Sequence, residues 1–320
     1  MRLLKLDPRP ATYDSVAEAS LDGAATTAVD PHVEMGDWRA ITPAIPRRTL
    51  AMAFVDGVQR IDRRVSAEGE GLPVPGILAS YAAGAVVPTS TRQYRHILVR
   101  RDTILAGGLL PDVIQVQTHS TCLEYLPATA TGEDAYVSLT TKLNEQRSDL
   151  EKVVVEHLRH EGVVDLLLVD GRLPLGAHDA VGFIKTLAAL YVTDPEHTDL
   201  LASLETGQRS PVFRIERARS LYSWYVCLRT PGAFDLALSG IARLEMDGGV
   251  PLADVTRTAD LTAALLPPYA STPERDDRAP QNLLPIGQLE RELRHQLGDP
   301  ELLQRFLLRA FQEEQPSWRK

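Results

Sequence analysis

The sequence has little cysteine and no long apolar run. Of 320 residues only Cys122 and Cys227 are cysteine, and their positions do not have the spacing of a metal site. This usage is typical of reduced thiols. No apolar stretch approaches the ~18 residues that a bilayer span requires. The N-terminal segment meets Asp7 and Pro8 too early for a signal peptide. We therefore expect a cytoplasmic protein.

Several motifs that would indicate a function are also missing. There is no glycine-rich phosphate-binding loop with its lysine, and Gly107-Gly108 lacks the rest of a dinucleotide fingerprint. His157 and His160 have no second pair at zinc spacing. The sequence therefore gives no support to a P-loop NTPase, a dinucleotide-dependent enzyme or a zinc enzyme.

The net charge of −9 argues against a protein that coats nucleic acid without specificity. It does not argue against one that cuts nucleic acid, because a metal cluster needs carboxylates and phosphate contacts need only a local basic strip. A charged edge strand that resists aggregation is an equally open interpretation of such strips. Two candidate strips are Arg60, Arg63 and Arg64, and Arg92, Arg95, Arg100 and Arg101.

Two apolar runs end at an aspartate that is followed by glycine. Leu50–Val55 precedes Asp56, and Leu166–Val169 precedes Asp170. Each run has the length and composition of a buried strand, so each places a carboxylate at the rim of a sheet. Two acids at one rim would be able to hold a divalent metal.

The alternative is that each Asp-Gly pair is a turn and nothing else. The second pair weakens that interpretation, because residues 172–176 do not resemble a returning strand. We expect the chain to continue there into a helix, as in a crossover connection. An arginine follows each aspartate within a few residues, Arg60 after the first and Arg172 after the second.

The pattern predicts an α/β fold with a mixed sheet and helices on both faces. Residues 1–47 are expected to form an irregular extension, and residues 48–320 one domain. Strands are predicted over 49–56 and 58–66 as a hairpin, and over 76–87, 95–100, 113–118, 166–170, 212–215, 221–228 and 240–246. Helices are predicted from Ser138, as N-cap, to 158, and over 177–191, 198–204, 252–265, 283–297 and 301–311.

Glu151 occupies an unusual position on the first of these helices. It falls inside the apolar arc of the helix, whereas Glu145 and Glu156 fall on the opposite side. A carboxylate that faces a core needs a cation or a metal as partner. Two interpretations stay open: an ion pair with Arg147 one turn away, or a metal ligand. The arc consists of Leu139, Leu143, Leu150, Val154 and Leu158.

These motifs, in this order, resemble the NurA family of DNA-end-processing nucleases. The resemblance extends over roughly residues 48 to 310, and its order and spacing are more specific than any one motif. It rests on Phe54–Gly57 with Arg60, Glu151 on a helix before Leu168–Leu173, Val181–Lys185, Ser223–Tyr225 and Ile241–Glu245.

The resemblance implies an RNase H-like fold and a DNA nuclease of double-strand-break end resection. It implies a homodimer that works with a hexameric HerA-type ATPase, and carboxylates that bind manganese or magnesium. On this chain the implied ligands, for two metal ions, are Asp56, Glu151 and Asp170. Candidate phosphate contacts are Arg60, Arg172 and Lys185.

The chain departs from the family pattern near its C-terminal helices. Archaeal members carry a Tyr-Pro-rich segment that ends in a histidine, and residues 279–287 contain neither the tyrosine nor the histidine. Gly287 stands at the histidine position. Asp276 and Asp277 lie just upstream as substitutes or as surface acids. A catalytically degenerate scaffold subunit of the translocase complex therefore remains the alternative function.

Overall fold

The computed structural model describes residues 3–6, 28–68, 73–88, 93–185, 190–217, 219–231, 238–272 and 280–313. Within them twelve strands form one sheet, in the order β2-β10-β11-β12-β9-β8-β3-β4-β5-β7-β6, with β1 beside β3. The strands are β1 (Leu3–Leu6), β2 (Ala28–Asp30), β3 (Met52–Glu68), β4 (Val74–Val87), β5 (Gln93–Leu105), β6 (Ile114–Gln117), β7 (Cys122–Thr129), β8 (Leu166–Asp170), β9 (Val181–Ile184), β10 (Phe213–Glu216), β11 (Ser220–Cys227) and β12 (Ile241–Asp247).

The centre of the sheet has the strand order β5-β4-β3-β8-β9. β3, β4 and β5 are antiparallel, whereas β8 runs parallel to β3 and β9 parallel to β8. The long helix α1 (Ala135–Glu161) lies between the antiparallel strands and β8 in the chain. This is the strand order of an RNase H-like fold. The predicted α/β class with a mixed sheet flanked by helices is confirmed.

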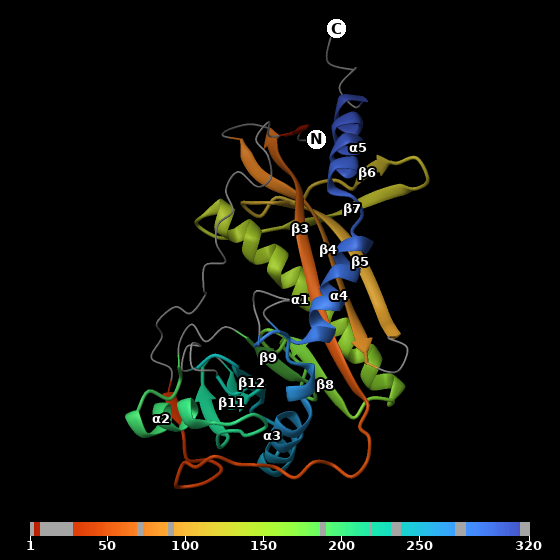
Figure 1. Ribbon diagram of the computed structural model, residues 1–320. Coiled ribbons are helices and arrows are strands. Elements are labelled where there is room, and N and C mark those ends of the chain that lie inside the picture. Colours follow the sequence, from red (N-terminus) through yellow and green to blue (C-terminus); the bar gives the residue numbers. More distant parts are fainter. Residues whose placement is uncertain are drawn as a thin grey trace.

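Helices cover both faces of the sheet (Figure 1). On β3, Val55 packs on the side of α1 and Phe54 on the side of α4, because successive side chains of a strand point to opposite faces. Both side chains are fully buried, and such burial stabilises the fold by about 1.5–3 kcal/mol for each large apolar side chain. The remaining helices are α2 (Pro195–Ser203), α3 (Leu252–Leu265), α4 (Leu284–Gln296) and α5 (Pro300–Glu313).

The predicted hairpin at Asp56-Gly57 is wrong. β3 continues through both residues, with Asp56 opposite Gly84 and Gly57 opposite Ala83 on β4. A Cβ atom on Gly57 would lie 2.4 Å from Oε1 of Glu151 on α1. The glycine is therefore explained by the close approach of α1, and Asp56 lies within a strand instead of at its end.

Substitution of Gly57 by alanine should lower the free energy of unfolding by about 1–3 kcal/mol, the usual cost of overpacking. The added methyl group would meet Glu151 Oε1 and also Arg147 Cγ, at 2.9 Å. Urea denaturation measures the effect. Gly36→Ala is the matched control, because nothing lies within 4 Å of a Cβ atom at Gly36. Equal midpoints for the two variants would contradict the close packing of α1 on Gly57.

The predicted helix over 177–191 is also wrong. β9 occupies Val181–Ile184, and the connection from β8 crosses over without a helix in residues 171–180. Gly182 has no room for a side chain, because a Cβ atom there would lie 2.8 Å from the backbone nitrogen of Leu173. Residues 186–189 lie outside the described part.

The start of α1 differs from the prediction as well. Asp134, and not Ser138, caps the helix: its carboxylate accepts hydrogen bonds from the backbone nitrogens of Tyr136 and Val137 at 2.8 and 3.0 Å. β7 was not predicted. The three C-terminal helices lie where the pattern placed them, within two residues at each end.

The described part of the N-terminal region joins the sheet, since Ala28–Asp30 pairs with β10. The division into an extension of residues 1–47 and a domain of residues 48–320 stays a prediction. Among the described residues, none of the helices combines the length and apolar character that a membrane crossing requires.

Candidate metal centre

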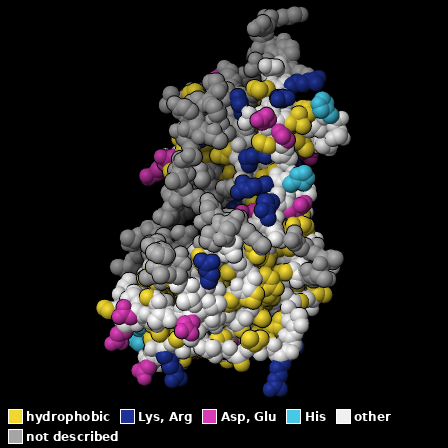
Figure 2. Space-filling model, viewed as in Figure 1, with side chains coloured by type: hydrophobic (Ala, Val, Ile, Leu, Met, Phe, Trp, Pro, Cys, Tyr) yellow, Lys and Arg dark blue, Asp and Glu magenta, His cyan; other side chains and the backbone are white. Residues whose placement is uncertain are grey.

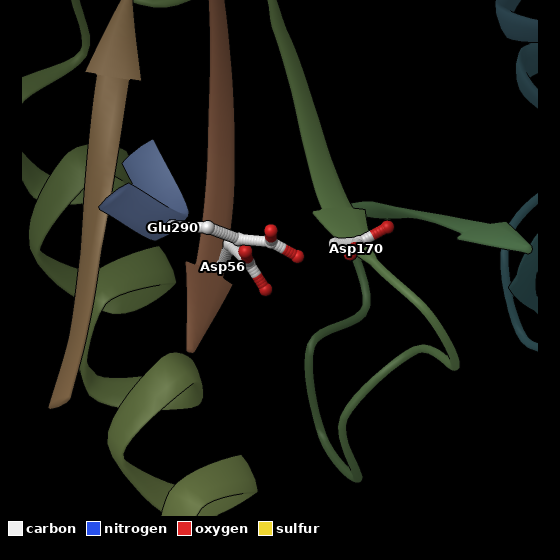
Figure 3. Close-up of side chains that lie close together, drawn as sticks. All are labelled: Asp56, Asp170 and Glu290. Atoms are coloured by element: carbon white, nitrogen blue, oxygen red, sulfur yellow. The ribbon is translucent and has the colours of Figure 1, made fainter. Parts of the chain in front are cut away.

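Three carboxylates from distant parts of the chain meet at one place. Asp56 in β3, Asp170 at the end of β8 and Glu290 on α4 each offer an oxygen, and these oxygens all lie within 4.8 Å of one another. Figure 3 shows the side chains of Asp56 and Glu290 next to each other and extending towards Asp170 at the end of β8. We call this group the acidic triad.

The fold explains why these three residues meet. β3 and β8 are parallel neighbours with Val55 opposite Val169, so the next residues, Asp56 and Asp170, lie side by side. Asp56 shares the α4 face of β3 with Phe54, two residues before it. On α4, Glu290 lies one turn after the buried Ile286 and one turn before the buried Leu293, so the helix directs its carboxylate to that same face.

The triad concentrates acidic groups at a partly buried position. Asp56 is only 3% exposed. Burial raises the pKa of Asp56 well above its ordinary value, and the neighbouring carboxylates of Asp170, Glu151 and Glu290 raise it further, while Lys185 opposes them. A group of acids that disfavour one another's ionisation either takes up a proton or binds a compensating cation.

One carboxylate oxygen of Asp56 is positioned for such a cation. Its Oδ1 accepts a hydrogen bond from the backbone nitrogen of Gly57 at 2.7 Å. Its Oδ2 is buried and has no hydrogen-bond partner among the described residues. Carboxylate oxygens are the ligands that hard divalent cations such as Mg²⁺ and Mn²⁺ prefer. The triad therefore fits such an ion.

A pocket of about 860 Å³ opens over the triad, and four cationic side chains line it. Lys185 follows β9 directly; its Nζ lies 2.7 Å from Asp170 Oδ2 and donates to Oδ1 of the buried Asn282 at 3.0 Å. The cationic lining residues are Arg147, Arg172, Lys185 and Arg294. Arg172 and Lys185, both predicted from sequence as phosphate contacts, thus lie at the triad.

Glu151 is placed differently. It is buried on α1, and its Oε1 lies 2.5 Å from Nη1 of Arg147, so the ion pair left open by the sequence is present. Burial raises the pKa of Glu151 to about 7 although Arg147 opposes the shift. Glu151 reaches β3 at Gly57, on the α1 face, and is not a member of the acidic triad. Its role as a metal ligand stays a prediction.

Arg60 holds the helix that carries Glu290. Its guanidinium donates to the carbonyls of Gly298 and Leu297, at 2.8 and 3.2 Å, and lies 2.8 Å from Oδ1 of the buried Asp62. A cation at a helix C-terminus also interacts favourably with the helix dipole. Arg60 does not line the pocket, so its predicted contact with phosphate is not supported by its position.

Substitution of Arg60 by methionine should lower the free energy of unfolding by about 3 kcal/mol, because the buried carboxylate of Asp62 loses its cation. Ser80 and Tyr125 still donate to Asp62 but carry no charge. Arg48→Met is the control: the side chain of Arg48 is 69% exposed in its pair with Asp165, so a loss below about 1 kcal/mol is expected. Chemical denaturation of both variants measures the difference, and losses of equal size would refute the structural role.

The other predicted basic side chains lie away from the triad pocket. Arg95 pairs with Glu161 at 2.8 Å, and Arg64 lies over the ring of Tyr136. Arg101 donates to the Leu297 carbonyl at 3.4 Å. Arg92, like Asp276 and Asp277, lies outside the described residues.

No model of a known protein family matches the chain. No curated protein matches it either. Among solved structures, the NurA nuclease from Sulfolobus solfataricus is similar to this chain, with 13% sequence identity and a TM-score of 0.49. The match covers 88% of this chain and 89% of that one.

Glu290 is the residue that sequence reasoning missed. The sequence feature that could have identified Glu290 is the one used for Glu151: a carboxylate within the apolar arc of an amphipathic helix. The buried residues Ile286, Leu289 and Leu293 of α4 surround its position at helical spacing. The family pattern placed the last site residue at Gly287 or in the segment before it, about one helical turn before Glu290.

Proposed function

We propose that this protein is a metal-dependent nuclease that hydrolyses phosphodiester bonds in DNA. The observation that carries the proposal is the acidic triad at the base of a pocket lined by four cations. Carboxylates alone suit several metal sites, but carboxylates surrounded by arginine and lysine suit a substrate that is itself a chain of phosphates. Mn²⁺ or Mg²⁺, as two ions, is the proposed cofactor.

Asp56, Asp170 and Glu290 are the proposed ligands. Divalent cations at this position would neutralise charge on the phosphate and activate a water molecule. The protein contributes rigidity, because two of the three carboxylates come from adjacent strands at the centre of the sheet and the third from a helix packed on them.

The cations around the pocket have the task of holding the phosphate backbone. Arg172 is exposed on the loop after Asp170, and Arg294 is exposed on α4, one turn beyond Glu290. Arg147 lies on the α1 side. Lys185 offsets the charge of the triad and would shift toward a phosphate when cations occupy the site.

The biological setting is a proposal supported by the sequence resemblance alone. The motifs around Asp56, Glu151 and Asp170 resemble the NurA family, which implies end resection of double-strand breaks. It also implies a homodimer, a hexameric HerA-type ATPase as partner and a cytoplasmic location.

A second candidate function is a catalytically degenerate subunit that shapes a DNA channel for such an ATPase. Residues 279–287 favour it, because the histidine of the archaeal pattern is missing there and Gly287 stands in its place. Calorimetric titration with Mn²⁺ separates the two functions, since the degenerate subunit would not bind the ion.

The deciding experiment is a nuclease assay on linear single-stranded and double-stranded DNA with Mn²⁺, Mg²⁺ or EDTA. We expect hydrolysis with the metal and none with EDTA. Asp170→Asn should lose the activity, whereas Asp112→Asn, an exposed acid outside the pocket, should retain it. Absence of DNA hydrolysis under all conditions would refute the proposal, and hydrolysis of an aryl phosphate alone would indicate a small-molecule phosphoesterase.

A further inference from the structure

We propose that a second pocket beside the acidic triad binds the next nucleotides of a single DNA strand. This inference rests on the proposed nuclease function. The second pocket has a volume of about 500 Å³, and Arg172 lines both it and the triad pocket, so the two adjoin at that side chain. A strand that passes the triad would therefore continue past Arg172 into this recess.

The charges of the second pocket favour phosphate. Two of its acids are neutralised by cations outside the lining: Glu145 lies 3.2 Å from Lys142, and Glu245 lies 3.0 Å from Arg243. Asp149 is the remaining acid. The lining also includes three arginines, which supply the cationic groups that a phosphate requires. The arginines are Arg172, Arg217 and Arg219.

Neighbouring groups fix the positions of two of these arginines. Arg219 donates to the carbonyls of Leu173 and Pro174 and thereby holds the loop that follows Asp170. The guanidinium carbon of Arg217 lies 4.8 Å from the centre of the Tyr191 ring, and stacking on an aromatic face holds an arginine in place. Positions fixed in advance lower the entropic cost of binding a phosphate.

The recess also offers an apolar wall. Leu175 is 79% exposed at the tip of the loop, and Pro174 and Leu221 line the pocket beside it. Sites for single strands combine cations for the backbone with apolar surface for the bases. α1 also contributes to the lining, through Ser148 and Asp149, and a recess of about 500 Å³ suits part of a single strand. A duplex would need contacts along two backbones.

Binding of a fluorescein-labelled oligothymidylate in EDTA, measured by anisotropy over a range of salt concentrations, tests the proposal. The slope of log affinity against log salt is negative, and Arg217→Gln should reduce its magnitude by about 0.7, the value for one lost phosphate contact on a single strand. Asp149→Asn should act in the opposite direction and tighten binding about threefold, because it removes a repulsive charge. Arg214→Gln is the control, since Arg214 pairs with Glu216 and lines neither pocket.

Steady-state hydrolysis gives a second readout. Arg217→Gln should raise KM for oligothymidylate severalfold and change kcat little, as expected for a contact made away from the reacting phosphate. If Arg217→Gln and Asp149→Asn both behave like the Arg214 control in slope and KM, the second pocket does not bind the strand. The binding measurement in EDTA does not depend on hydrolysis. If the protein shows the expected salt slopes but cleaves no DNA, the proposed strand-binding pocket is supported and the proposed nuclease function is refuted.

Discussion

Replacement of Asp56 by asparagine should abolish DNA hydrolysis and stabilise the metal-free protein at the same time. Loss of a ligand at the metal centre removes several kcal/mol of transition-state stabilisation, a loss of about 10³-fold or more in rate. The buried amide carries no charge, so the repulsion from Asp170 and Glu290 disappears. We expect a gain of about 1 kcal/mol without metal, or a few degrees in melting temperature.

The pH dependence of stability provides an independent check on the same residue. The pKa of Asp56 in the folded protein is raised above its ordinary value of 3.8, so the folded state binds the proton more tightly than the unfolded state does. Its contribution to stability is therefore present at low pH and is lost as the pH rises through the folded pKa. The metal-free wild type should lose more stability with rising pH than Asp56→Asn, in which only Glu151 of these two buried acids still titrates with a raised pKa.

Calorimetry with and without Mn²⁺ measures both effects. Mn²⁺ should raise the melting temperature of the wild type, because it binds the folded state alone, and should have little effect on Asp56→Asn. Asp112→Asn again serves as the control. A variant Asp56→Asn that retains wild-type hydrolysis, or that melts below the wild type without metal, would rule out the role assigned to the triad.

Substitution of Glu290 by glutamine should reduce DNA hydrolysis by about 10²- to 10³-fold. The amide keeps the shape of the side chain but removes one of the three charges that bind the cation. Part of the loss should be recovered at higher Mn²⁺ concentration, because the main defect is weaker binding of the ion. The metal concentration that gives half-maximal activity is the quantity to compare.

Two other glutamates make the comparison specific. Glu292→Gln, on the same helix but hydrogen bonded to Gln296 at the surface, should behave like the wild type. Glu151→Gln tests the ligand predicted from sequence: a shifted Mn²⁺ requirement would assign Glu151 to the metal as well, and an unshifted one would leave it as the partner of Arg147. Wild-type activity of Glu290→Gln at low Mn²⁺ would remove Glu290 from the site.

The sequence was sufficient to associate Asp56 and Asp170 with buried strands, and the structure shows that the two strands are neighbours. Apolar runs of strand length carry the first part of that information. The environment of Gly57 does not follow from local pattern, because the same dipeptide serves as a turn in one protein and as a contact surface for a helix in another. The structure shows that α1 occupies the space above Gly57.

Long-range packing explains the other errors. Val181–Ile184 is short and flanked by residues compatible with a helix, and its pairing with β8 and β12, which lie far from it in local pattern, makes it a strand. Glu290 meets Asp56 because α4 packs on β3, and helical phase alone does not say which strand a helix covers. The part of the site that sequence predicted is the part formed by neighbouring strands.

The continuity of β3 has a consequence for changes in chain length. Asp56 and Arg60 lie on one face of this strand, one at the metal centre and the other at the C-terminus of the helix that supplies Glu290. A single inserted or deleted residue between them would turn one of the two to the opposite face. Insertions and deletions are accommodated more readily at the turn of Thr118 and Thr121 between β6 and β7, where local hydrogen bonds and the contact of His119 with Phe306 would be lost. The protein can thus acquire new surface features there, whereas the segment from Asp56 to Arg60 must keep its number of residues.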